Sequence, residues 1–168
     1  VKRVSGIFLK LPGDLSLWNE AVNRNKKSVT IDLNQEKGRE VAYRLVKKSD
    51  VFLTSLRKPA IEKMKMNYPV LSQLNPGLVY AWVSGYGPQG PDRNVGAFDY
   101  QGQGRSGLMF SVGEPQMPPL VSQLGIIDQA TSIMGSHEIL TALLMRERFG
   151  IGQEVHVSIL SSALCLLY

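Results

Sequence analysis

Cysteine is almost absent from this sequence of 168 residues, since Cys165 is the single one. A lone cysteine cannot form an internal disulfide, which excludes a disulfide-stapled secreted domain and favours the reducing cytoplasm. The chain also lacks any apolar run near the roughly 18 residues that a membrane-spanning helix needs, and it shows no signal-type segment at its start. We therefore expect a cytoplasmic protein with no membrane contact.

Residues suited to metal binding and to hydrolysis are also scarce. The two histidines, His137 and His156, have no cysteine or carboxylate at metal-ligand spacing, so we expect both to be packing residues and expect no metal. A serine hydrolase is not indicated either, because the sequence contains no G-x-S-x-G elbow.

Charge of either sign is modest: 20% of the residues are charged, and the net charge is +5. This balance suggests an anionic partner but does not distinguish a nucleotide phosphate from a polynucleotide. The basic stretch at residues 24–27 lacks the interleaved aromatic side chains of nucleic-acid surfaces, so we expect no nucleic-acid partner. It is either a solvated loop or a phosphate-binding loop at the edge of a sheet.

What is present is an ordinary share of hydrophobic residues, 43%, in a length that suits about one domain. Both ends look cut, because Val1 opens directly into patterned sequence and residues 158–168 form an apolar, helix-like run without a cap. We therefore expect part of a longer protein.

Strand-like and helix-like segments alternate along the chain. Short β-branched or apolar runs predict strands, and helical periodicity with capping residues predicts helices. This alternation argues for an α/β fold with a parallel sheet, flanking helices and right-handed crossovers. The strand at residues 50–55 lacks polar alternation and should be buried on both faces. We expect strands at residues 4–11, 28–33, 50–55, 78–84 and 154–157, and helices at residues 35–48 (capped by Asn34), 59–64, 68–74, 98–109 and from residue 158 onward.

A further helix, ending at Phe149, is the most periodic segment of the chain. Apolar or small side chains recur at the i, i+3, i+4, i+7 spacing of a buried face. Asp128 stands where this pattern begins, in the place of an N-cap, where backbone N–H groups and the helix dipole should keep its carboxylate ionised. An ordinary capping aspartate is the alternative interpretation. The predicted buried face comprises Ala130, Ile133, Met134, His137, Leu140, Thr141 and Leu144.

Residues 102–107 read G-x-G-x-x-G, and Asp128 follows about twenty residues later, as in a dinucleotide-binding fingerprint. That fingerprint requires a strand running into the first glycine within a βαβ unit. Here no strand is predicted before Gly102, and a proline-rich loop separates the motif from Asp128. The context therefore argues against dinucleotide binding.

Five segments in register resemble the class III CoA-transferases, which include formyl-CoA and carnitine CoA-transferases and, as a relative, α-methylacyl-CoA racemase. They are residues 23–33, 38–57, 74–91, 97–109 and 146–164. The resemblance implies a Rossmann-like large domain, and residues 1–168 correspond to an incomplete large domain without the small domain or the extreme N-terminal segment. It also implies an interlocked homodimer.

The resemblance implies that Asp128 is the nucleophile of a CoA-transferase. Its carboxylate would attack an acyl-CoA to form an aspartyl anhydride, then an aspartyl-CoA thioester, before CoA passes to a carboxylic acid acceptor. Coenzyme A is thus the implied cofactor, carried as substrate, with no metal. The residues matching the family's CoA contacts are Ile31, Asp32, Leu33, Asn34, Ser55, Leu56, Arg57, Lys63, Ala97, Phe98, Asp99 and Tyr100.

Some positions depart from the family pattern. Ser55 replaces an asparagine, Lys63 replaces an arginine and so loses bidentate geometry, and Lys10 is a candidate for an N-terminal cationic contact. The racemase relatives carry a Gly-His-Asp triplet where this chain has Phe98 in the middle, and phenylalanine cannot accept a proton. Transfer is therefore favoured over racemisation, with a catalytically inactive fragment as the remaining alternative.

Overall fold

The computed structural model describes residues 12–13, 16–123 and 125–168, in two compact units, Val1–Thr30 and Ile31–Tyr168. Within the first unit, α1 (Leu17–Val22) begins after Ser16, whose hydroxyl accepts a hydrogen bond from the backbone N–H of Asn19 at 3.3 Å. The strand expected at residues 4–11 and the candidate Lys10 lie outside the described residues.

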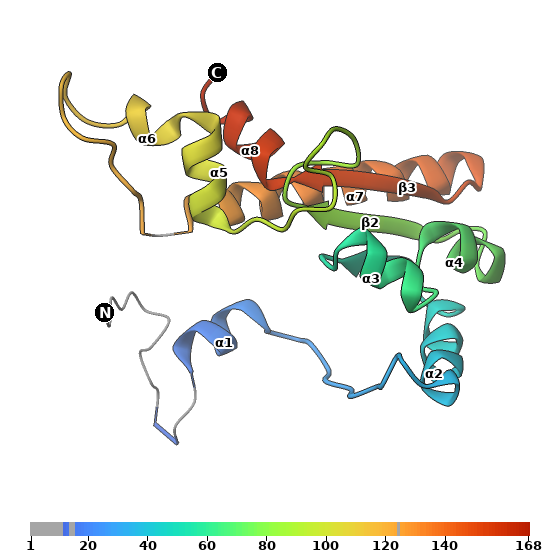
Figure 1. The fold of residues 1–168 in the computed structure, drawn as a ribbon. Coiled ribbons are helices and arrows are strands. Elements are labelled where there is room, and N and C mark those ends of the chain that lie inside the picture. The colour runs from blue at the N-terminus through green and yellow to red at the C-terminus, as the bar shows by residue number, and fades with distance from the viewer. Residues whose placement is uncertain (1–11, 14–15, 124) are drawn as a thin grey trace. The chain divides into compact units, whose positions relative to one another are not determined.

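The second unit is built on a parallel sheet of three strands in the order β1-β2-β3, as the alternating pattern predicted (Figure 1). Every connection between consecutive strands contains helices, which is what parallel pairing requires. The strands are β1 (Val51–Thr54), β2 (Val79–Ser84) and β3 (Gln153–Ser158); the helices are α2 (Glu36–Val46), α3 (Lys58–Lys63), α4 (Tyr68–Leu74), α5 (Asp99–Ser106), α6 (Leu108–Ser111), α7 (Ile126–Phe149) and α8 (Ile159–Cys165).

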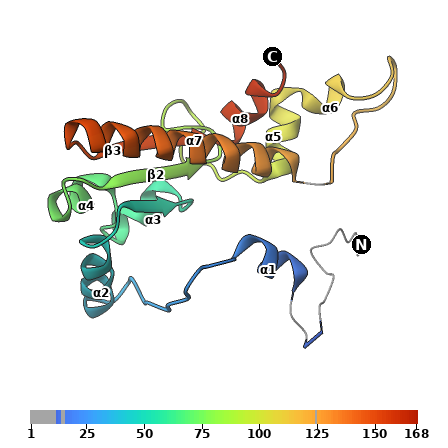
Figure 2. The same cartoon turned by 180° about the vertical axis from the view of Figure 1, so that it is seen from behind.

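Helices cover both faces of the sheet. The two opposite views show α7 along one face, with α3 and α4 on the other (Figures 1 and 2). Alternating side chains of β2 pack against the helices on the two faces of the sheet. Tyr80 and Trp82 lie in one core cluster with Ile61 from α3 and Leu71 from α4. Ala81 instead points to the side of α7, where it lines a small apolar cavity. None of the helices that the structure describes combines the length and apolar character needed to cross a membrane.

The strand expected at residues 28–33 is wrong, because these residues form no strand. Alternation indicates a strand only where a neighbouring strand can pair with it, and Val29 is 66% exposed. The cap expected at Asn34 is also wrong: α2 starts after Gln35, and the backbone N–H of Asn34 donates to Asp32 Oδ1 at 3.0 Å. The strand β1 is less buried than expected, with Leu53 61% exposed.

The long helix ends at Phe149 as predicted, with Gly150 as its C-cap at φ 71°. Most of its predicted buried face is wrong, since Ile133 is 67% and Leu140 63% exposed, although Ala130 is buried as expected. Small residues line the real contact with the sheet: a Cβ on Gly135 would lie 3.2 Å from Val157 Cγ1. Large apolar residues dominate the periodic pattern, so the pattern predicted that the side of α7 that carries them faces the sheet, and that side is exposed. The residues of α7 that are buried are Ile127, Ala130, Thr131, Gly135 and Ala142.

The helix expected at residues 98–109 is divided into α5 and α6 at Gly107, which has φ 84°. That left-handed conformation suits glycine and ends a helical run. The G-x-G-x-x-G motif lies largely inside α5, so the structure agrees that it is not a strand-to-helix phosphate loop.

Candidate functional site

A cleft of about 340 Å³ lies beyond the carboxyl ends of β1 and β2. Ligands of open parallel sheets bind at this edge, where the loops after the strands converge. The cleft brings together five residues that the sequence singled out, from two segments far apart in the chain: Ser55, Leu56, Arg57, Ala97 and Phe98. Asn94 and Arg93 also line it, and sequence reasoning missed them because they lie in an irregular loop without a motif.

The turn after β1 is held by one hydrogen bond from β2 and one local hydrogen bond. Trp82 Nε1 donates to the carbonyl oxygen of Leu56 at 2.9 Å, and the backbone N–H of Leu56 donates to Thr54 Oγ1 at 3.2 Å. The guanidinium of Arg57 then packs against Gly96, where a Cβ would lie 2.8 Å from Arg57 Nη2. The glycine therefore leaves room for a cation at the wall of the cleft.

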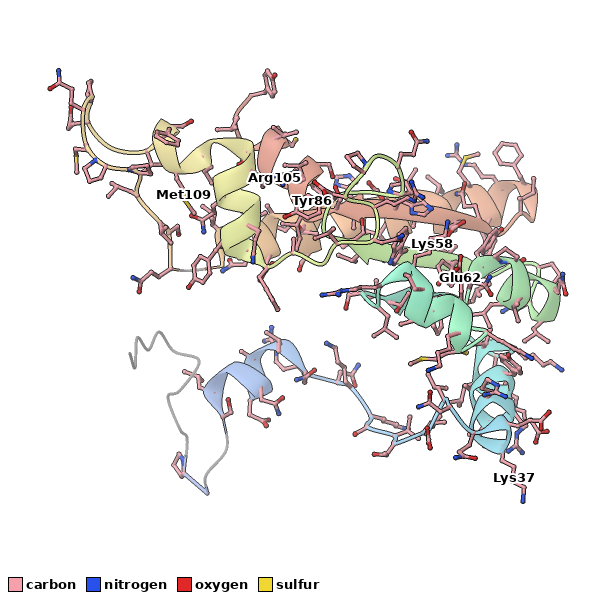
Figure 3. The ribbon with its side chains drawn as sticks, viewed as in Figure 1. Lys37, Lys58, Glu62, Tyr86, Arg105 and Met109 are labelled. Carbon is pink, nitrogen blue, oxygen red and sulfur yellow. The ribbon has the colours of Figure 1, made fainter. Side chains whose placement is uncertain are left out.

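The loop between β2 and α5 is fastened to α5 by Arg105 (Figure 3). The guanidinium carbon of Arg105 lies 5.0 Å from the ring centroid of Tyr86, and its Nη2 forms an ion pair with Asp92. Such cation–π and ionic contacts hold the loop from two points. The residues after Asp92, including Arg93, thus reach the cleft from an anchored loop.

Asp128 occupies the first turn of α7 and is not its N-cap, which corrects the prediction. Gly125 is the N-cap, with φ 61°, and it has no side chain to satisfy the first N–H groups. Asp99 from α5 does so instead: its Oδ1 accepts from the backbone N–H of Ile127 at 2.7 Å and of Asp128 at 3.1 Å. The cap of α7 is therefore supplied by another helix.

The carboxyl of Asp128 is on the surface but close to another negative group. Partial burial, and then the negative charge of Asp99, raise the pKa of the Asp128 carboxyl above its ordinary value. The backbone N–H groups that were expected to stabilise the ionised form of Asp128 are instead directed to Asp99. A carboxylate with a raised pKa is more basic, and more nucleophilic once ionised.

Other candidate residues lie away from the cleft. Ile31 and Leu33 pack against the core cluster of β2, α3 and α4. Asp32 and Asn34 are exposed in the same segment, which precedes α2. Lys63 is exposed at the end of α3.

Tyr100 and the two histidines also lie outside the lining of the cleft. Tyr100 is 54% exposed on α5, next to the buried Asp99. His156 packs edge-on against Trp82 at 5.3 Å, as expected of a packing residue, whereas His137 is exposed. Among the described residues, no group of three or more histidine, cysteine, aspartate or glutamate side chains could hold a metal ion.

Comparison with known proteins identifies relatives that match nearly the whole length of this chain. The family model for CoA-transferase family III matches residues 4–168. An acyl-CoA transferase of Fusarium pseudograminearum is 35% identical over 94% of this chain and 37% of its own length. An acetyl-CoA:oxalate CoA-transferase of Acetobacter aceti is 35% identical over 92% of this chain and 40% of its own length.

A solved structure agrees with this assignment. The crystal structure of a CAIB/BAIF family protein from Brucella suis is similar with a TM-score of 0.88 and 31% identity, over 95% of this chain and 42% of that one. The chain spans about two fifths of the length of these relatives. The chain belongs to CoA-transferase family III.

Proposed function

We propose that the intact protein moves CoA from an acyl-CoA donor to a carboxylic acid acceptor, with Asp128 as the nucleophile. One observation carries the proposal: the cleft and Asp128 are joined through two consecutive residues. Phe98 lines the cleft, and the adjacent Asp99 accepts the hydrogen bond from the backbone N–H of Asp128. A ligand bound in the cleft would thus lie beside the first turn of α7.

The steps balance with this chain's carboxylate and the two substrates alone. An oxygen of Asp128 attacks the thioester carbonyl, which forms an aspartyl anhydride and releases CoA thiolate. The thiolate attacks the aspartyl carbonyl, which releases the donor acid and leaves an aspartyl-CoA thioester. The acceptor carboxylate attacks that thioester, forming a new anhydride and thiolate. The thiolate then takes the acceptor acyl group, and Asp128 is regenerated.

The cleft has the chemistry that CoA requires. Arg57 and Arg93 both line it, and guanidinium groups suit phosphate oxygens. Phe98, at 75% exposure, and Ile159 offer apolar surface for a pantetheine arm. We propose that Ser55, Leu56, Ala97 and Tyr100 complete these contacts, and that Lys63 and the turn at Ile31, Asp32, Leu33 and Asn34 serve the adenosine end outside the cleft.

The test is Asp128→Asn in the intact protein, which keeps the size of the side chain and removes the nucleophile. Transfer from acyl-CoA to an acceptor acid should fall to background, while CoA binding measured by calorimetry stays within about twofold of the unaltered protein, because CoA contacts come from the cleft. Asp50→Asn is the matched control, since Asp50 pairs with Arg146 at the other end of α7, at 3.0 Å. Unchanged turnover in Asp128→Asn would rule out the proposed nucleophile.

We further propose a homodimer. The outward side of α7 carries apolar residues that the described chain leaves uncovered, with Ile133 67%, Leu140 63% and Leu144 51% exposed. Apolar side chains in a row on one helix are typical of an interface. Light scattering of the intact protein should give twice the chain mass. We retain the cytoplasm as the proposed compartment, because Cys165 carries an exposed free thiol that a reducing environment preserves.

A further inference from the structure

We infer that Asp99 is a positioning residue for the nucleophile: its buried carboxylate fixes the first turn of α7, and with it Asp128, beside the cleft. The inference rests on the proposed function and gives Asp99 a role other than direct contact with CoA. Asp99 is 5% exposed, and both of its oxygens accept hydrogen bonds from protein groups, so its carboxylate is held inside the protein and is not presented to a ligand.

A second buried side chain extends this contact to the segment before α7. Gln103, at 1% exposure, lies one helical turn after Asp99 and donates from Nε2 to Asp99 Oδ2. Gln103 also donates from Nε2 to the carbonyl oxygen of Ser122 and accepts from its backbone N–H at Oε1, each at 2.9 Å. The chain is therefore held by α5 both before and inside the first turn of α7.

The helix that carries Asp99 is itself closely seated. A Cβ on Gly102 would lie 2.5 Å from Ile159 Cγ2 and 3.2 Å from Ile127 Cγ2, so the missing side chain is what lets α5 approach α8 and α7. Ile127 is fully buried in this contact, at 0% exposure. Tight packing of this kind keeps the distance between the Asp99 and Asp128 groups nearly constant.

The contact also changes the chemistry of Asp128. Backbone N–H groups at a helix start normally stabilise a nearby carboxylate in its ionised form. Here the N–H groups of Ile127 and Asp128 are directed to Asp99, which adds a fixed negative charge. Asp99 is also the charged group that contributes to the raised pKa of Asp128. Asp128 thus keeps a position at the helix start without the full stabilisation that would make its carboxylate a poorer nucleophile.

Other charged groups on the packed elements do not replace Asp99. On α5 the remaining charged residue is Arg105, which is paired with Asp92. The helices α6 and α8 contain no aspartate, glutamate, lysine, arginine or histidine. The next acidic residue of α7 is Glu138, ten positions and about 15 Å along the helix axis from Asp128.

The experiment compares Asp99→Asn with Asp50→Asn in the intact protein, using acyl-CoA, an acceptor acid and a pH series. Asparagine keeps Oδ1 as an acceptor but turns an N–H group toward Gln103 Nε2, which is already fixed by Ser122. We expect kcat to fall by about 10²-fold through misplacement of the nucleophile, with KM for acyl-CoA changed by less than about threefold. The acid limb of kcat/KM should move to lower pH, because the negative neighbour is gone. Asp50→Asn should leave that limb in place.

A second variant covers the case in which Asp99→Asn does not fold. Gln103→Met keeps the approximate volume of the glutamine side chain and leaves the charge of Asp99 in place. It removes the hydrogen bonds of Gln103 with Asp99 and Ser122. It should lower kcat and leave the acid limb where it is. Unchanged kcat in Gln103→Met, or a folded Asp99→Asn with an unaltered acid limb and kcat, would overturn the inference. Asp128→Asn measured alongside separates the cases: if it turns over normally the proposed function fails, and if it is inactive only the role of Asp99 is at issue.

Discussion

Gly96→Ala tests whether CoA binding depends on the position of the Arg57 guanidinium in the cleft. The added Cβ would lie 2.8 Å from Arg57 Nη2 and 2.9 Å from Nε. Ordinary contact begins near 3.4 Å, so the guanidinium must move by about 0.6 Å, the difference between 3.4 and 2.8 Å. Arg57 is an exposed, flexible side chain and can shift, so the free energy of unfolding should change little.

The shift should instead weaken CoA binding. A charge-assisted hydrogen bond contributes about 1.5–3 kcal/mol, so losing one between Arg57 and a phosphate raises the Kd of CoA by about tenfold to a hundredfold. Calorimetry of the intact protein with CoA measures this directly. Gly104→Ala is the matched control, because its Cβ would meet only the Met109 side chain, at 3.9 Å, away from the cleft.

The effect of Gly96→Ala should pass entirely through Arg57. In an Arg57→Ala background, adding Gly96→Ala should then change the Kd of CoA by less than about twofold, a strongly non-additive cycle. Equal effects of Gly96→Ala with and without Arg57 would refute the reasoning, as would a single Gly96→Ala variant that binds CoA normally.

Two other predictions follow from the same structure. In D₂O, the intact protein should not place deuterium at the α-carbon of a 2-methylacyl-CoA at catalytic rates, because Phe98 stands where the racemase relatives have a base; mass spectrometry detects the exchange, and its appearance would favour the racemase. Gly152→Ala should lower the free energy of unfolding by about 1–3 kcal/mol, since its Cβ would lie 2.6 Å from the Leu78 carbonyl oxygen. Urea titration measures this, and Gly104→Ala, in open helix surface, should be neutral or slightly stabilising.

The sheet could be predicted because local signals and tertiary structure agree there. The run at residues 79–84 is apolar and bounded by glycines, and α4 has the bounds that its proline and asparagine indicated. The same local signals failed at residues 28–33, where alternation is present but no neighbouring strand pairs with it. A strand forms only where its backbone hydrogen-bonds to a neighbouring strand, and the sequence of one segment does not show whether such a neighbour is present.

The cap of α7 could not be predicted for a related reason. Capping rules examine the residues next to the helix, and they favoured Asp128 because it is the nearest acidic side chain. The real acceptor, Asp99, lies 29 positions earlier and reaches the helix only because α5 packs beside α7. Burial, and then the charge of Asp99, raise the pKa of Asp128, and neither effect of the tertiary structure could be derived from the local sequence.

Glycines around the cleft show why a correct choice of segments still leaves the site undetermined. Gly85, Gly96 and Gly102 each act through a side chain they lack: a Cβ would lie 2.8 Å from Ala97 Cβ at Gly85, 2.8 Å from Arg57 Nη2 at Gly96 and 2.5 Å from Ile159 Cγ2 at Gly102. From the sequence alone, Gly85 and Gly96 are loop residues, and Gly102 belongs to the G-x-G-x-x-G motif whose phosphate-binding role was rejected. Their partners come from the turn after β1, the loop after β2 and α8, so only the folded chain reveals that these close approaches shape one cleft and seat the helix that holds Asp128.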